Sequence, residues 1–184
     1  MAKFKILLDS NAYLRLGDSF HPLLGVSFGN MNYTLYLIPE FQKEFRKNPR
    51  LKNKFGWVDQ PEYIENRKKR IRILKDQKEE IKLTYSYLWA QNISEKIGAS
   101  RVDVKALAYG SVLDVPVVTD DFDMTELADQ FSIEIWGIFD LLKVMYKNGM
   151  AGKKQIKALI GFLEYINDFP YKSFRKRVKK RFKI

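Results

Sequence analysis

The sequence predicts an α/β fold with a mainly parallel central sheet. Apolar runs typical of buried strands alternate along the chain with segments whose apolar residues recur at helical spacing. This alternation is typical of parallel strands that are connected through helices. The length of 184 residues fits one domain. A chain of this size buries about 70% of the surface that its unfolded form exposes, so it needs no disulfide or metal to fold.

The first predicted strand covers residues 4–8 and ends at Asp9. Ser10 and Asn11 can cap the helix that we expect to follow it. Residues 17–32 are rich in Gly, Ser and Asn, which indicates a loop or a broken helix.

A second strand is predicted over residues 33–38. Pro39 then stands where a helix tolerates proline, in its first turn, and residues 40–47 continue that helix. Residues 48–61 are expected to be an irregular connection. Residues 62–97 are expected to be helical, as two helices with a basic, exposed first part and a second part that faces the core.

The second half of the chain continues the alternation. Helices are expected over residues 100–113, 120–130 and 138–147, and strands over residues 115–119 and 132–136. After two glycines that break the chain, residues 153–167 form an amphipathic helix, and a basic tail follows Pro170.

The basic residues gather in two stretches. The chain has 33 Lys and Arg against 22 Asp and Glu, a formal net charge of +11. Residues 172–184 contain eight basic groups and no acid, and residues 67–82 contain eight basic groups against three acids. Clustered positive charge favours a nucleic-acid partner, because phosphate contacts release counterions. A solubilising tail explains the same charge equally well.

The absence of cysteine and the single histidine exclude several kinds of chemistry. A disulfide framework, a thiolate zinc site, a cysteine nucleophile and a His-rich metal site are all ruled out. No apolar run approaches the roughly 18 residues of a membrane-spanning helix. The apolar stretch near the N-terminus stops at Leu8 and is too short for a signal peptide. We therefore expect a cytoplasmic protein with no membrane partner.

Several acids follow predicted strands. Asp9 ends the first strand, and Asp120 and Asp121 follow the strand over residues 115–119. In open α/β sheets, ligands collect outside the carboxyl ends of the strands. These two strands therefore deliver carboxylates to one edge of the sheet.

Helix-borne acids extend this set. Glu40 and Glu44 lie in the first turns of the helix after the second strand, and Asp103 lies in the first turn of a later helix. Converging carboxylates raise one another's pKa unless a cation neutralises them. An all-oxygen site of this kind suits Mg²⁺ or Mn²⁺, and such an ion beside a basic surface is typical of phosphodiester hydrolysis.

Each acid also has a structural explanation. Asp9 and Asp120 can cap the helices that follow them, and Ser100 with Asp103 has the spacing of a capping box. Glu40 suits the positive end of a helix dipole. Taken singly, these roles explain each acid better than catalysis does. The gathering of the acids at one edge favours a catalytic site.

At four places the sequence resembles PIN domains. Phe4-Lys5-Ile6-Leu7-Leu8-Asp9-Ser10-Asn11 is similar to their opening strand, in which a hydrophobic run ends in Asp. Ser100-Arg101-Val102-Asp103, followed by Ala106-Leu107-Ala108, and then Val117-Val118-Thr119-Asp120-Asp121, resemble the second half of the pattern. Residues 39–45 resemble, more weakly, the segment that carries a Glu. The resemblance spans residues 4 to about 137 in the family's order.

The resemblance implies a three-layer α/β/α sandwich and a metal-dependent ribonuclease that binds Mg²⁺ or Mn²⁺. It assigns the catalytic acids to Asp9, Glu44, Asp103 and Asp121. It assigns the metal ligands to Asp9, Asp103 and Asp121, with Asp120 and Asp123 as acids that share or replace the last role. Glu40 is a rival to Glu44, and Ser10, Asn11 and Thr119 would orient the acids or bound water.

The basic stretches depart from the compact family pattern. We expect a PIN-like nuclease domain over residues 1–150, with a basic helical insertion around 48–97, and a C-terminal helix and basic arm over 151–184 that packs on the domain or extends from it. The basic residues expected to bind RNA are Arg67, Lys68, Lys69, Arg70, Arg175, Lys176, Arg177, Lys179, Lys180 and Arg181.

Small PIN proteins are commonly VapC-like toxins of toxin–antitoxin pairs. The resemblance therefore suggests a toxin with a cognate antitoxin as partner, and it allows a homodimer. Ribosomal-RNA maturation nucleases share the same core. The alternative is a catalytically inactive or RNA-processing PIN-like protein that binds RNA.

Overall fold

The computed structural model describes residues 4–184; residues 1–3 of the first predicted domain lie outside the described part. Its centre is a five-stranded sheet of order β2-β3-β1-β4-β5. The pairs β3–β1, β1–β4 and β4–β5 are parallel, and β2–β3 is antiparallel. The strands are β1 (Lys5–Leu8), β2 (Ser27–Phe28), β3 (Tyr33–Leu37), β4 (Val117–Val118) and β5 (Ile135–Trp136). The predicted α/β fold with a mainly parallel sheet is confirmed.

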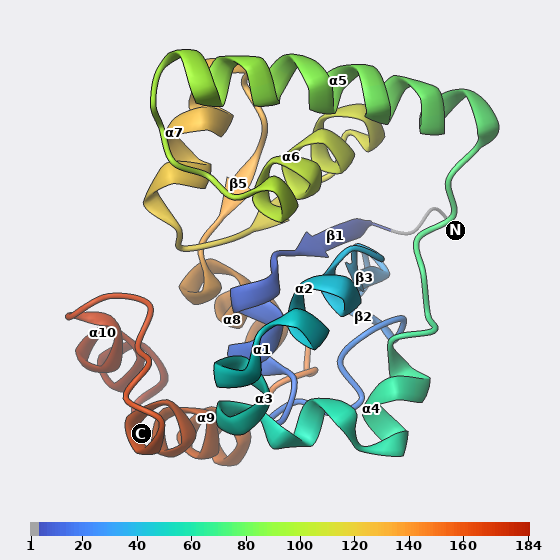
Figure 1. The fold of residues 1–184 in the computed structure, drawn as a ribbon. Helices are drawn as coiled ribbons and strands as arrows, with labels where there is room; N and C mark the ends of the chain where they lie inside the picture. Colours follow the sequence, from blue (N-terminus) through green and yellow to red (C-terminus); the bar gives the residue numbers. More distant parts are fainter. Residues whose placement is uncertain (1–3) are drawn as a thin grey trace.

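Helices lie on both faces of this sheet (Figure 1). The first face is covered by α5 (Lys75–Ser94), α6 (Arg101–Leu113) and α7 (Phe122–Gln130). The second face is covered chiefly by α1 (Ser10–Leu16), α8 (Ile138–Lys147), α9 (Lys153–Tyr165) and α10 (Phe174–Phe182). Four short helical segments complete the second side: α2 (Phe41–Lys47), α3 (Pro49–Lys54), the 3-10 turn η1 (Gly56–Asp59) and α4 (Pro61–Asn66).

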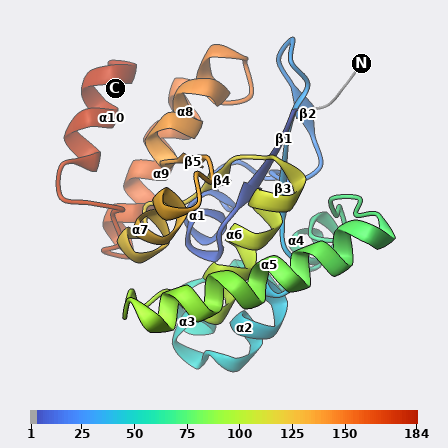
Figure 2. The same ribbon diagram turned by 90° about the horizontal axis from the view of Figure 1, so that it is seen from above.

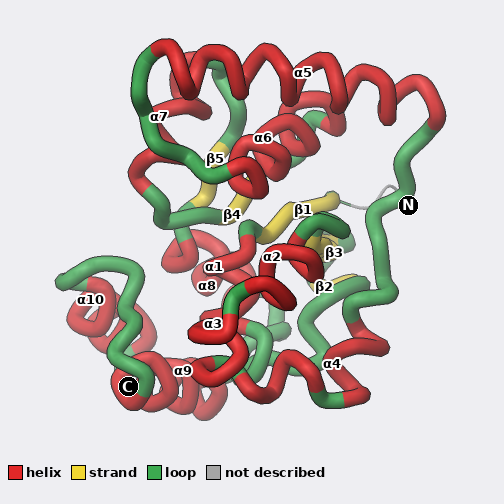
Figure 3. Tube along the Cα trace, viewed as in Figure 1, coloured by secondary structure: helices red, strands yellow, loops and turns green. Residues whose placement is uncertain are grey.

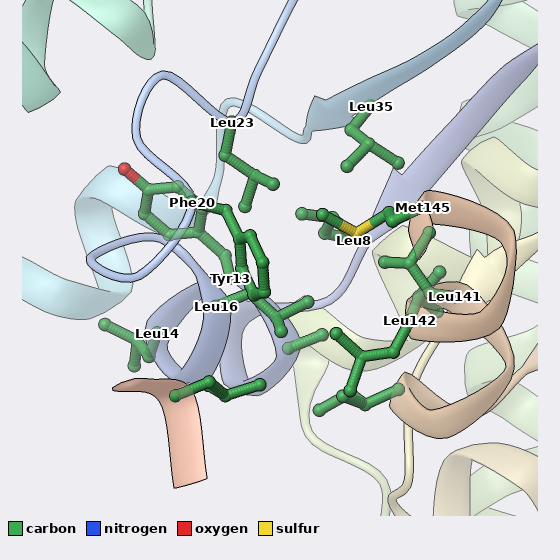
Figure 4. Packing of buried hydrophobic residues seen from close by; sticks show 14 of the residues in the cluster. Leu8, Tyr13, Leu14, Leu16, Phe20, Leu23, Leu35, Leu141, Leu142 and Met145 are labelled. Atoms are coloured by element: carbon green, nitrogen blue, oxygen red, sulfur yellow. The ribbon is translucent and has the colours of Figure 1, made fainter. Parts of the chain in front are cut away.

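The strands separate two hydrophobic clusters because their side chains alternate between the faces. Leu7 and Val117 are buried on the α6 face, whereas Leu8 and Val118 are buried on the α8 face. Figure 4 shows Leu8 among side chains of the second face, with Leu141 and other residues of α8 on one side and residues of α1 on the other. Each sheet face therefore has its own apolar core.

The order of the strands reverses at β1. The connection from β1 to β3 passes over the α8 face. The connection from β3 to β4 begins with α2, α3 and α4 on that side and then crosses to α5 and α6, and the connection from β4 to β5 passes over the α6 face through α7. This arrangement follows from the right-handedness of parallel crossovers, since the chain moves first to one side of β1 and then to the other. The crevice outside the carboxyl ends of β1 and β4 is therefore the topological switch point, where open α/β sheets bind their ligands.

Three predicted segments differ from the structure (Figure 3). The expected loop over residues 17–32 includes β2, which pairs with β3, and the expected irregular connection over 48–61 contains α3 and η1. The expected pair of helices over 62–97 is α4 and α5, but residues 67–74 between them are not helical. The prediction of a basic helix there is wrong, because Ile71 is buried and Ile73 packs against the α6-face core from a non-helical segment.

The C-terminal segment belongs to the same hydrophobic core as the rest of the second face. Ile156, Leu159 and Leu163 of α9 are buried there, and so are Phe174 and Val178 of α10. Figure 2 shows α10 alongside α8 and α9 at one end of the molecule. Within residues 4–184, no helix combines the length and apolar character needed to span a membrane.

Candidate active site

Asp9 is the first residue after β1 and lies almost fully buried at the switch point. Its carboxylate accepts hydrogen bonds from the backbone N–H of Ala12 and from the Thr119 hydroxyl. Burial raises the pKa of Asp9 to about 7, although the two hydrogen bonds oppose the shift. The charge of Asp103 raises this pKa further, and that of Arg15 lowers it. Asp9 therefore caps α1, but burial disfavours the ionised form of its carboxylate.

Thr119 connects the ends of the two central strands. Its Oγ1 donates to Asp9 at the end of β1 and accepts from the backbone N–H of Asp121 at 3.0 Å. Asp121 in turn accepts from the backbone N–H of Met124 at 2.9 Å, which makes it the N-cap of α7. Because residues alternate along an extended segment, Asp9, Thr119 and Asp121 continue the positions that face α6.

Asp103 faces this group from the first turn of α6. It forms the predicted capping box with Ser100, since its Oδ2 accepts from the Ser100 backbone N–H at 2.9 Å. Burial raises the pKa of Asp103, and the hydrogen bonds with Ser100 lower it in part. The charges of Asp121 and Asp123 raise the same pKa further.

Glu44 joins the group from α2. The Ser10 hydroxyl donates to Glu44 Oε2 at 2.7 Å and so connects α2 to the start of α1. Burial raises the pKa of Glu44, the Ser10 hydrogen bond lowers it, and the charge of Asp103 raises it again. Asp103 therefore interacts electrostatically with acids from each of the other elements.

We call these five acids the carboxylate edge. They come from the end of β1, from α2, from α6 and from the start of α7: Asp9, Glu44, Asp103, Asp121 and Asp123. Among the sequence-predicted acids, these are the ones that the structure brings within electrostatic range of one another.

The donor chemistry of the carboxylate edge fits Mg²⁺ or Mn²⁺, since every donor is an oxygen. Within residues 4–184, no three acidic, histidine or cysteine side chains lie close enough together to form a complete metal cage. Mg²⁺ is commonly held by one or two carboxylates and keeps several of its waters. The raised pKa values of Asp9, Glu44 and Asp103 mean that the edge favours either a proton or a cation.

Asp120 lies on the other side of the sheet. Its Oδ2 accepts from the backbone N–H of Ile138 at 3.0 Å, at the start of α8. Burial raises its pKa, while the Ile138 hydrogen bond and the Arg15 charge lower it. Of the neighbouring acids, the structure thus places Asp121 and Asp123 at the carboxylate edge and turns Asp120 toward α8.

Glu40 and Asn11 are also separate from the carboxylate edge. Glu40 is the N-cap residue of α2 and lines a different cavity, together with Tyr109 of α6. Asn11 is exposed on α1. Of the three residues expected to orient the acids, Ser10 and Thr119 contact Glu44 and Asp9 directly.

The basic residues after α4 have different surroundings. The Arg67 guanidinium donates to Gln42 at 3.2 Å and to the Tyr13 hydroxyl at 3.2 Å, so it packs against the domain. Lys68 forms an ion pair with Glu65. Lys69 and Arg70 are exposed.

The basic residues of α10 surround its buried stripe. Arg177 lies over the Phe139 ring, 4.4 Å from its centroid, and Arg175 pairs with Glu164 of α9. The remaining predicted RNA-binding residues of this helix are exposed: Lys176, Lys179, Lys180 and Arg181.

Sequence reasoning did not single out a cluster of ion pairs on the second face. Asp168, between α9 and α10, accepts from Arg15 of α1 at 3.0 Å and from Lys54 of α3 at 3.1 Å. Burial alone would raise the pKa of Asp168, but the hydrogen bonds and charges of Arg15 and Lys54 lower it overall. No short motif indicates these partners, because the three residues lie far apart in the sequence. We call Arg15, Lys54 and Asp168 the ion-pair cluster.

Comparison of the chain with protein-family models, with curated proteins and with solved structures finds no match. The functional argument therefore depends on the geometry of the carboxylate edge.

Proposed function

We propose that this chain is a divalent-metal-dependent ribonuclease with a PIN-like three-layer sandwich, and that the carboxylate edge is its active site. The observation that carries the proposal is the convergence of acids from four separate elements at the switch point, where burial raises the pKa of Asp9, Glu44 and Asp103. Asp103 raises the pKa of both Asp9 and Glu44, and Asp121 and Asp123 raise that of Asp103. Perturbed acids gathered at a ligand-binding edge are typical of functional sites.

The candidate ligands of Mg²⁺ or Mn²⁺ are Asp9, Asp103, Asp121 and Asp123, of which one or two would bind the ion directly and the others through its coordinated waters. When bound, the ion would lower the pKa of a coordinated water and stabilise charge on the phosphate. Thr119 fixes Asp9 by its hydroxyl hydrogen bond and fixes Asp121 through the backbone. The chain thus holds carboxylates from two strand ends in a set relation to one another.

We assign Glu44 the role of accepting a proton from the attacking water. Ser10 engages Glu44 Oε2, so Oε1 is the atom to which we assign this role. Burial and the Asp103 charge raise the pKa of Glu44, which makes its carboxylate a better proton acceptor. The excess of basic residues, at +11 overall, supports a polyanionic substrate.

The test is cleavage of transfer-RNA and ribosomal-RNA fragments by the purified chain, with Mg²⁺, with Mn²⁺ and with a chelator. We expect cleavage with either ion, none with chelator, and a loss of about 100-fold or more in Asp103→Asn, because that acid interacts with all the others. Asparagine keeps an oxygen for the Ser100 hydrogen bond, so circular dichroism should show an intact fold. Asp129→Asn, at an exposed position on α7, is the matched control and should cleave at the wild-type rate.

Equal cleavage by Asp103→Asn and wild type would show that the site is elsewhere. Tight, salt-sensitive RNA binding without metal-dependent cleavage would instead select the alternative of a catalytically silent RNA-binding protein.

A further inference from the structure

A cavity that none of the five acids of the carboxylate edge lines lies near the start of α2. It has a volume of about 570 Å³ and lies between the start of α2, the segment 70–73, α5 and α6. Its apolar wall includes Ile71, Ile73 and Ile81. A flat ring can therefore pack against these apolar side chains inside the cavity.

Basic side chains surround this cavity. Five of them line it: Arg70, Arg72, Lys78, Lys82 and Lys105. Lys82 pairs with Glu79, and Lys105 lies 4.9 Å from the centroid of the Tyr85 ring. Within the described part of the chain, no carboxylate forms an ion pair with Arg70, Arg72 or Lys78. These three cations remain available for an anion such as a phosphate group.

One acid, Glu40, lines the same cavity. Its Oε2 is buried and has no hydrogen-bond partner among residues 4–184. Arg70 and Tyr109 line this cavity together with Glu40. Burial and the Glu40 charge raise the pKa of Tyr109 to about 12, while Arg70 lowers it in part. A buried carboxylate oxygen without a donor costs free energy, which a ligand N–H would recover.

We propose that this cavity binds one nucleotide of a single-stranded RNA, with its phosphate on Arg70, Arg72 and Lys78 and its base read by Glu40. A carboxylate accepts hydrogen bonds from the amino groups of cytosine, adenine and guanine. Uracil has no amino group, and its N3–H donor lies between two carbonyl oxygens that repel a carboxylate. The inference rests on the proposed function, because it takes RNA as the ligand.

The position of Glu40 places this nucleotide next to the one being cut. The backbone N–H of Glu44 donates to the Glu40 carbonyl at 3.2 Å, so the two acids lie one helical turn apart on α2. Glu44 faces the carboxylate edge, and Glu40 faces the cavity. A strand that crosses the start of α2 would therefore contact both.

Binding of labelled oligocytidylate and oligouridylate of equal length tests this proposal by fluorescence anisotropy. The full chain carries Asp103→Asn, so that cleavage does not interfere. We expect the cytidine strand to bind about tenfold more tightly than the uridine strand, and Glu40→Gln to reduce this preference to about twofold or less. Glu126→Gln removes one acid at an exposed position on α7 and should keep the full preference.

A separate variant tests the contact between the basic residues and the phosphate. Lys78→Ala should weaken binding of both strands by a similar factor and reduce the slope of affinity against salt by about 1, because a phosphate contact is lost without any base contact. Equal binding of the two strands before mutation, or a preference that survives Glu40→Gln, would overturn the proposal. Affinity is measured without cleavage, so the binding result can be interpreted even if the nuclease test fails. Cleavage of RNA without a base preference in binding would contradict the nucleotide subsite and leave the proposed nuclease function in place.

Discussion

The carboxylate edge contains a buried aspartate, Asp9, and the ion-pair cluster contains a half-buried one, Asp168, and the charges around the two residues differ in sign. Asp9 shares the edge with other acids, and burial raises its pKa to about 7. Asp168 lies between Arg15 and Lys54, which hold its pKa below the usual value. Arg15 lies within range of both, since its charge also lowers the pKa of Asp9. The protein thus pairs Asp168 with its own cations, whereas Asp9 lies among acids and has a raised pKa.

This difference separates structural from functional burial of charge. An acid with paired cations stabilises the fold and gains nothing from a ligand. Buried acids with raised pKa values reduce the stability of the free protein at neutral pH, and such acids are typical of functional sites. The comparison predicts that substitution by asparagine stabilises the protein at Asp9 and destabilises it at Asp168.

The largest expected effect comes from the hydrophobic support of the ion-pair cluster. Phe174 is fully buried at the start of α10, just after the loop that carries Asp168. We expect Phe174→Ala to lower the free energy of unfolding by about 3–5 kcal/mol, measured by urea denaturation. Lys176→Ala, on the exposed side of the same helix, should change it by about 0.5 kcal/mol or less. Similar values for the two variants would show that α10 is not part of the core.

Asp9→Asn should stabilise the protein in the absence of divalent ions. The raised pKa of Asp9 means that the folded state binds the proton more tightly than the unfolded state, so wild-type stability falls as pH rises from about 4 to about 7. Asparagine removes the charge and still caps α1. We expect a gain of about 1–3 kcal/mol at about pH 8 that shrinks toward pH 4.

Burial of the Asp9 carboxylate sets most of this effect, while the charges of Asp103 and Arg15 change it in opposite directions. A variant that is less stable than wild type at about pH 8, in metal-free urea denaturation, would contradict a destabilising burial of the ionised carboxylate.

Asp168→Asn should have the opposite effect. Its lowered pKa adds stability that is present above the unfolded value of about 3.8 and is lost as pH falls through the lower folded value. We expect a loss of about 1–2 kcal/mol at neutral pH, because Arg15 and Lys54 lose a half-buried partner. Thermal unfolding followed by circular dichroism measures it. The deficit should shrink as pH falls below about 3.8, and a deficit that stays constant there would contradict the electrostatic cause.

The smallest expected effect is stabilisation by Mg²⁺. An ion at about ten times its dissociation constant adds about 1.4 kcal/mol, which raises the melting temperature by roughly 3–5 °C. Asp103→Asn should lose most of this rise, whereas Asp168→Asn should keep it, because only the first variant alters the carboxylate edge. Equal rises in both variants would place the ion elsewhere.

Much of the fold could be predicted from residue patterns. The helix over residues 138–147 has the bounds that its apolar spacing indicates, and β1 and β4 lie within the predicted buried runs. The segment 67–74 was misassigned because its basic residues favour helices, whereas burial of Ile71 decides its conformation. In α10, the many charges obscure a stripe of Phe174, Val178 and Phe182 at a spacing of four.

The positions of the acids could be predicted from the sequence only in part. The strand pattern predicts one edge for Asp9, Asp120 and Asp121, and alternation along the chain after β4 then turns Asp120 away from the other two. That alternation is readable in the sequence once Val117 and Val118 are assigned to opposite faces. The ion-pair cluster and the Glu40 cavity depend on tertiary contacts between distant segments, which no local pattern contains.

Asp120 and Asp121 therefore provide the most direct test of the carboxylate edge as the catalytic site. The two residues are neighbours, and each substitution to Asn removes one charge and keeps an oxygen for a backbone hydrogen bond. We predict that Mg²⁺-dependent RNA cleavage falls by about 10-fold to 100-fold in Asp121→Asn and by about twofold or less in Asp120→Asn. Equal losses in the two variants, or a larger loss in Asp120→Asn, would contradict the account.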